Sequence, residues 1–171
     1  MRATIASVDD QANVCVEVPS EIAYRHVVLR AVEAVCKIAI VRACGDKTPA
    51  DGFTHQVVSA VGEGFNNIVL HCYPERAADI VRVQMKIQAD GLQISMEDFG
   101  ASFDPASAPV PELDAMPESG LGIFIMRSFM DEVKYRAGRP NVLILSKRIH
   151  GCSEVLPRIS GRRTSDGLLH K

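Results

Sequence analysis

The order of helical and strand-like patterns predicts an α+β fold: a two-layer α/β sandwich with a mixed, mainly antiparallel sheet and helices on one face. Three observations carry this prediction. Apolar residues recur at helical spacing in two long stretches, residues 81–97 alternate between apolar and polar side chains, and a third helical pattern opens at residue 120. The 171 residues suffice for one domain with a sizeable core.

The first half of the chain reads as a strand followed by two helices. Residues 1–13 form a lead-in, residues 14–18 a short strand, and a helix runs from Glu21 to about Val41. Residues 44–52 form a loop rich in Gly, Pro and Asp. A second helix follows from Val57 to Tyr73, and we expect its apolar stripe to face the core: Val57, Val58, Val61, Phe65, Ile68, Val69 and Cys72.

A second, polar stripe follows the same helix at intervals of four residues: His55, Ser59, Glu63, Asn67 and His71. No Lys or Arg occurs between Asp51 and Pro74, although surface helices usually carry them. A carboxylate and a carboxamide one turn apart favour a site for a hard cation and a nearby proton transfer. The alternative is a lightly polar face packed against another element.

Residues 81–97 give the clearest strand pattern. Apolar and polar residues alternate on both sides of Asp90-Gly91, a hairpin turn signal. From Asp98 to Ser119 four prolines interrupt regular structure, which predicts a functional lid or a disordered insert. Residues 131–137 and 142–147 then read as strands joined by a turn, so residues 14–148 form the domain and residues 149–171 a flexible tail.

Composition excludes several classes of function. A net charge of −2 and a pI of about 6.2 argue against direct nucleic-acid or membrane binding driven by bulk charge. No membrane span or secretory signal is visible. The five cysteines include no C-x-x-C pair, which argues against zinc, and their odd number argues against a disulfide framework. We expect them to be buried and reduced in a cytoplasmic protein.

Three short stretches carry the candidate chemistry: residues 63–67 on the second helix, 98–104 at a strand end, and 119–123 at a helix start. Alone, each has an ordinary explanation, such as a strand end or a flexible joint. Together, in this order, they resemble the N, G1 and G2 boxes of the GHKL ATPase/kinase superfamily. The stretch GLGIFIMRSFMDEV (residues 120–133) is most similar to the anti-sigma factor serine/threonine kinases of partner-switching systems. The resemblance covers residues 14–148.

This resemblance implies a GHKL (Bergerat-type) sandwich that binds ATP with Mg²⁺. Glu63 corresponds to the general base, and Asn67 to the Mg²⁺ ligand. Asp98 corresponds to the acceptor for the exocyclic amine of adenine, and Gly100 lets the backbone approach the base. The remaining nucleotide-binding residues by this resemblance belong to the third stretch and its helix: Ser119, Gly120, Leu121, Gly122, Ile123 and Arg127. The P-loop and Rossmann signatures are absent from the sequence.

The resemblance also implies partners: an anti-anti-sigma (STAS-type antagonist) protein that is phosphorylated on serine, a sigma factor, and a second copy in a homodimer. One departure matters. Seven acidic residues and no Lys or Arg occur between Lys86 and Arg127, whereas phosphoryl transfer relies on cations around the transferring group. The alternative is therefore an ATP-dependent protein-binding regulator with little or no kinase activity. The catalytic piece of a histidine kinase fits less well, because no helix with a phospho-acceptor His precedes the domain.

Overall fold

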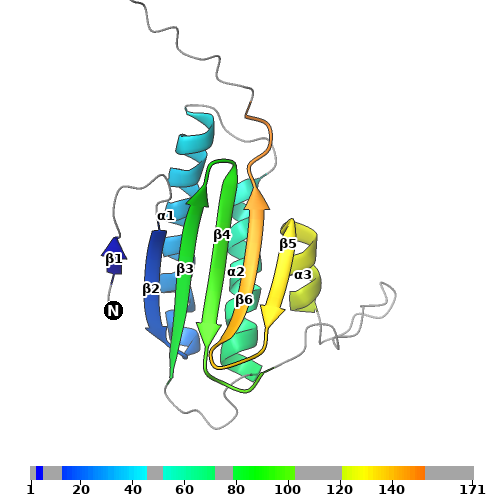
Figure 1. Cartoon of the computed structure of the whole chain (residues 1–171). Helices are drawn as coiled ribbons and strands as arrows, with labels where there is room; N and C mark the ends of the chain where they lie inside the picture. Colours follow the sequence, from blue (N-terminus) through cyan, green and yellow to red (C-terminus); the bar gives the residue numbers. More distant parts are fainter. Residues whose placement is uncertain (1–2, 6–12, 46–51, 72–78, 103–120, 153–171) are drawn as a thin grey trace, which may run out of the picture.

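The computed structural model describes residues 3–5, 13–45, 52–71, 79–102 and 121–152, which form two layers (Figure 1). One layer is a six-stranded sheet, and α-helices form the other. The elements are β1 (Ala3–Ile5), β2 (Asn13–Pro19), the 3-10 helix η1 (Ile22–Tyr24), α1 (Arg25–Cys44), α2 (Phe53–His71), β3 (Ile80–Gln88), β4 (Gly91–Asp98), α3 (Leu121–Phe129), β5 (Glu132–Arg136) and β6 (Asn141–Arg148). The predicted two-layer sandwich is confirmed.

The strands follow the order β1-β2-β3-β4-β6-β5, and every described pairing is antiparallel. The described sheet is therefore antiparallel throughout rather than mixed. β1 lies within the expected lead-in and pairs with β2, so part of that segment extends the sheet. Helix α1 contacts β2, β3 and β4, α2 contacts β4 and β6, and α3 contacts β5, which places the helices on one face (Figure 1).

The β3–β4 hairpin follows the predicted alternation, with its turn shifted by one residue. Gln88 pairs with Gly91, so the turn residues are Ala89 and Asp90 instead of the expected Asp90-Gly91. Gly91 belongs to β4, where a Cβ atom would collide with the backbone carbonyl of Lys147 on β6. The glycine is required for close approach of two strands and not for the turn.

The core lies between the helices and the inner face of the sheet. The alternating apolar residues of β3 and β4 are buried, and so is the stripe of α2 that includes Val57, Val61, Phe65 and Ile68. Val58 and Val69 are half-buried at the edges of that stripe, and Cys72 lies outside the described residues. The outer face of the sheet is polar. There Arg82 donates hydrogen bonds to carboxylates on both neighbouring strands.

The inner face of β6 carries two buried polar residues among its apolar ones, Asn141 and Lys147. Lys147 is 7% exposed, and its ammonium group donates a 2.8 Å hydrogen bond to the carbonyl oxygen of Phe129, the last residue of α3. A cation at the C-terminus of a helix stabilises the free carbonyl groups there. Lys147 thus ties the end of α3 to the sheet.

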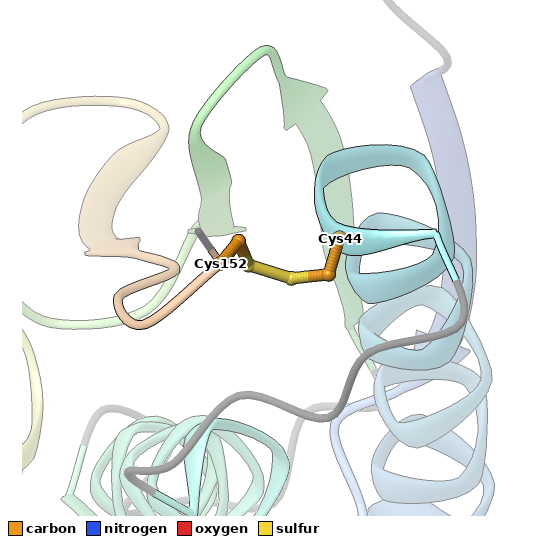
Figure 2. Close-up of a disulfide and its surroundings, with 2 residues drawn as sticks. All are labelled: Cys44 and Cys152. Atoms are coloured by element: carbon orange, nitrogen blue, oxygen red, sulfur yellow. A yellow bond between two sulfur atoms is a disulfide. The ribbon is translucent and has the colours of Figure 1, made fainter. Parts of the chain in front are cut away.

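The cysteines require a correction. Cys44, the last residue of α1, forms a disulfide with Cys152, which follows β6 (Figure 2). We expected reduced cysteines, but 108 residues separate the two, and only the fold brings the ends of α1 and β6 to the same end of the sandwich. Cys15 and Cys36 are free, and burial raises the pKa of Cys36 to about 12.

The two long helices begin at different residues from those expected. The first helix begins at Arg25, after the 3-10 turn, and not at Glu21. The second begins at Phe53, four residues earlier than expected. No helix in the described part of the chain is long and apolar enough to cross a bilayer. Most of the predicted lid (residues 103–120) and most of the predicted tail (residues 153–171) lie outside the described residues.

Candidate functional site

Helix α2 presents Glu63 and Asn67 on one face, one turn apart, and both side chains are half-buried. The first turn of α3 lies directly against them. A Cβ atom built on Gly122 would lie 3.0 Å from Oε2 of Glu63 and 3.5 Å from Oδ1 of Asn67. The structure therefore brings together the first and third of the three candidate stretches.

The start of α3 supplies backbone donors to this cluster. The amide groups of a first helical turn have no acceptor within the helix, and the positive end of the helix dipole adds to their attraction for anions. At Gly122 no side chain separates these amides from Glu63 and Asn67. Two acceptor side chains and a row of donors thus share one location, which is suited to a cation and the phosphates it accompanies.

The other residues predicted from the third stretch lie in different surroundings. Leu121 is exposed, and Ile123 is half-buried against the core. Arg127 is exposed in the last turn of α3, about 9 Å along the axis from the first residue of that helix. Ser119 and Gly120 lie outside the described residues. Gly122 lies close to both acceptor side chains.

Asp98 ends β4 and is almost completely buried, with 1% of its surface exposed. Its Oδ1 atom accepts two hydrogen bonds, at 3.0 Å from Nδ2 of Asn141 and at 2.9 Å from the backbone N–H of Gly100. Burial raises the pKa of the Asp98 carboxyl, and these two hydrogen bonds act in the opposite direction. Among the described residues, none donates a hydrogen bond to Oδ2.

Asn141, at the start of β6, organises the surroundings of Asp98. Its Nδ2 atom also donates to the carbonyl oxygen of Gly100 at 3.1 Å, and its Oδ1 accepts from the backbone N–H of Gly138 at 3.1 Å and from the hydroxyl of Ser102. The side chain is fully buried. Sequence reasoning placed Asn141 in a turn and missed this role. The available signal was the alternation of β6, which puts residue 141 on the same inward face as Leu143.

Asp98 with Asn141 forms one group of residues, and Glu63, Asn67 and Gly122 form the other. Both groups lie toward one end of the sandwich. Figure 1 shows the end of β4, the start of β6 and the C-terminal part of α2 side by side there. A Cβ atom on Gly64, the residue after Glu63, would meet the side chain of Met96, so the Glu63–Asn67–Gly122 cluster lies next to the last residues of β4, which ends at Asp98. The arrangement offers a buried acceptor for a base or similar group, and a separate set of ligands for an anion with its cation.

Comparison with known proteins identifies the family. The model of the histidine kinase-like ATPase domain matches residues 18–147. The chain belongs to this family. The matched range contains every described residue of the candidate site, so membership of the histidine kinase-like ATPase domain family confirms the resemblance to the GHKL superfamily drawn from the three boxes.

Relatives within the family are regulators of the kind that the sequence resembles. An anti-sigma F factor of Clostridium beijerinckii is 27% identical over 127 residues, which are 69% of this chain and 87% of that protein. The serine-protein kinase RsbW of Bacillus velezensis is 29% identical over 112 residues, which are 58% of this chain and 70% of that protein. The resemblance to anti-sigma factor kinases is thereby confirmed.

A solved structure agrees at the level of the fold. The RsbU and RsbW domains of Rv1364c from Mycobacterium tuberculosis superpose with a TM-score of 0.51 at 13% identity. The match covers 79% of this chain and 32% of that chain. This chain therefore corresponds to about a third of that solved chain, and the likeness shows a shared fold.

Proposed function

We propose that this protein is an anti-sigma factor serine/threonine kinase that uses Mg-ATP to phosphorylate a serine of an anti-anti-sigma (STAS-type antagonist) protein, and so controls a sigma factor. One observation carries the proposal. A buried carboxylate, Asp98, ends the strand that packs against α2 next to Glu63, and α2 in turn brings Glu63 and Asn67 against Gly122. Family membership and the names of the relatives support the same assignment.

Asp98 would hold the adenine. Its Oδ2 would accept a hydrogen bond from the exocyclic amine, while Gly100 donates to Oδ1 and keeps the carboxylate in place. A hydrogen bond to a charged group contributes about 1.5–3 kcal/mol. The buried position makes the interaction selective, because a base without a donor at that point would leave the carboxylate unpaired.

Glu63 would act as the general base. It would take the proton of the attacking serine hydroxyl as the hydroxyl oxygen bonds to the γ-phosphorus and the bond to the leaving ADP oxygen breaks. Proton transfer of this kind typically contributes about 10²- to 10⁴-fold in rate. The half-buried position of Glu63 next to the first turn of α3 is compatible with this role.

Asn67 fits a magnesium ligand. Its amide oxygen is a hard, neutral donor and faces the start of α3, where phosphates would lie. When bound, Mg²⁺ would neutralise charge on the phosphates during transfer. The backbone N–H groups of Gly122 and its neighbours, including Ser119 and Gly120, would hold phosphate oxygens.

The proposed partners and cellular location are based on the family assignment. We propose a homodimer that acts in the cytoplasm and contacts proteins and not nucleic acid. The protein would bind either the sigma factor or the unphosphorylated antagonist, so that phosphorylation of the antagonist decides which complex persists.

A second function has a specific observation in its favour. The chain has seven acidic residues and no Lys or Arg between Lys86 and Arg127, and Arg127 lies in the last turn of α3, away from the first-turn amides. A site without a cationic side chain at the transferring phosphate would bind ATP but turn it over slowly. The protein would then be an ATP-dependent binding regulator.

Incubation with γ-labelled ATP, Mg²⁺ and a candidate antagonist separates these functions. The kinase proposal expects label on one serine of the antagonist, and none on an antagonist in which that serine is replaced by Ala. ATP binding without transfer would favour the regulator. Absence of ATP binding by the folded protein would refute both.

A further inference from the structure

We propose that Asn141 is the positioning residue that determines base specificity in the adenine site. By donating a hydrogen bond to Oδ1 of Asp98, it fixes this carboxylate as an acceptor for the base. The inference rests on the proposed ATP site and assigns the choice between adenine and guanine to a residue that does not touch the nucleotide.

The orientation of the Asn141 amide is fixed by two backbone neighbours, one of which can only donate a hydrogen bond and the other only accept one. The backbone N–H of Gly138 can only donate, and it lies 3.1 Å from Oδ1 of Asn141. The carbonyl oxygen of Gly100 can only accept, and it lies 3.1 Å from Nδ2. A flipped amide would place donor against donor and acceptor against acceptor. Nδ2 therefore faces Asp98 as a donor.

This orientation determines which hydrogen bonds the Asp98 carboxylate can form with a base. Nδ2 of Asn141 and the N–H of Gly100 both point at Oδ1, which must act as an acceptor. We assign Oδ2 to the base, and in the ionised carboxylate this oxygen too can only accept. Adenine presents an amino group, a donor, at the position where guanine presents a carbonyl oxygen. Guanine would place two acceptors against each other in a buried site.

Loss of Asn141 would weaken the preference for adenine over guanine. Burial raises the pKa of Asp98, and the charge of Asp79 acts in the same direction. The hydrogen bonds from Asn141 and Gly100 oppose them. Without the Asn141 donor, the carboxyl binds a proton more readily, and a protonated Oδ2 becomes a donor that matches guanine. Position 141 thus governs whether the buried carboxyl accepts or donates.

The test measures dissociation constants for Mg-ATP and Mg-GTP with Asn141→Leu, which keeps the size of the side chain and removes both donors. We expect ATP affinity to fall about tenfold and the ratio of GTP to ATP dissociation constants to fall by a similar factor, as for one lost charge-assisted hydrogen bond. Asn141→Thr keeps a single hydroxyl donor and should give an intermediate ratio. It decides the question if the Leu variant does not fold.

Lys147→Met is the matched control, because Lys147 is the other buried polar residue on the same face of β6. It should lower stability and leave the ratio of dissociation constants unchanged. An Asn141 variant that weakens ATP and GTP equally, or that keeps the wild-type ratio, would overturn the inference while the proposed function stands. A wild-type protein that binds neither nucleotide would refute the proposed function itself.

Discussion

Glu63 on α2 and Gly122 on α3 are so close that a Cβ atom at residue 122 would lie 3.0 Å from Oε2 of the carboxylate. They lie in separate helices, yet the helical backbone of one directly faces the side chain of the other. The contact joins the candidate base to the start of α3, where we propose that phosphates bind. A side chain at residue 122 would push the Glu63 carboxylate aside and enter the space between donors and acceptors, which favours glycine at this position.

Gly122→Ala should separate stability from activity. Alanine favours the helix by up to about 1 kcal/mol over glycine, so the melting temperature should stay the same or rise. The added methyl group would displace the Glu63 carboxylate, so Mg-ATP affinity and phosphotransfer should both fall. Ser128→Ala, at an exposed position of the same helix, serves as the control. Unchanged phosphotransfer in Gly122→Ala would remove this contact from the site.

Glu63→Gln should abolish phosphotransfer and preserve ATP binding. The amide has nearly the shape of the carboxylate but cannot accept the serine proton, which predicts a loss of about 10²- to 10⁴-fold in rate. Initial rates of antagonist labelling and ATP titrations measure the two effects. Glu33→Gln, which removes a carboxylate from an ion-paired position on α1, should change neither. Retained turnover in Glu63→Gln would exclude this residue as the base.

Asp98→Asn should lose adenine binding and gain stability at neutral pH. Burial raises the pKa of Asp98 above its ordinary 3.8. A carboxyl with a raised folded-state pKa contributes its stability below the unfolded-state value and loses it as the pH rises through the folded-state value. The amide does not titrate, so the variant's advantage in unfolding free energy should be small near pH 4 and larger at pH 7.

Urea unfolding at the two pH values tests this dependence, and ATP titration at pH 7 tests the loss of affinity. Asp90→Asn provides a control, since that carboxylate is exposed in the β3–β4 turn. An advantage that shrinks from pH 4 to pH 7 would contradict the raised pKa. Full ATP affinity in Asp98→Asn would contradict its role in base recognition.

Cys44→Ser should make the stability of the protein insensitive to reducing agent. A cross-link between residues 108 apart restricts the unfolded chain, and disulfides of this kind typically contribute about 2–5 kcal/mol. The oxidised wild type should lose this stability on reduction, as followed by thermal unfolding. Cys15→Ser should still respond, because Cys15 is free. Non-reducing peptide mapping that finds no Cys44–Cys152 link would refute the bond.

The sequence predicted those parts of the structure that depend on local periodicity. The alternation across β3 and β4 placed Asp98 at a strand end, and the spacing along α2 placed Glu63 and Asn67 on one face. These patterns are visible because each residue's environment repeats every two or four positions. The resemblance of the three boxes then supplied roles that periodicity alone left open.

Contacts between distant segments could not be predicted in this way. The Asn141–Asp98 hydrogen bond spans 43 residues, and the Cys44–Cys152 bond spans 108. The glycine at residue 91 was assigned to the turn because Asp-Gly is a strong local signal, whereas the approach of β6 determines its role. In each case the deciding neighbour comes from another part of the chain.

A titration of isotope-labelled protein with Mg-ATP, followed by two-dimensional NMR, tests whether the three stretches form one nucleotide site. We expect saturable binding, with the largest amide shifts at Glu63, Asn67, Asp98, Gly100 and Gly122. The polar outer face of the sheet, represented by Gln84 and Ser95, should show little change. Absence of binding, or shifts concentrated on that outer face, would contradict a nucleotide site at these residues.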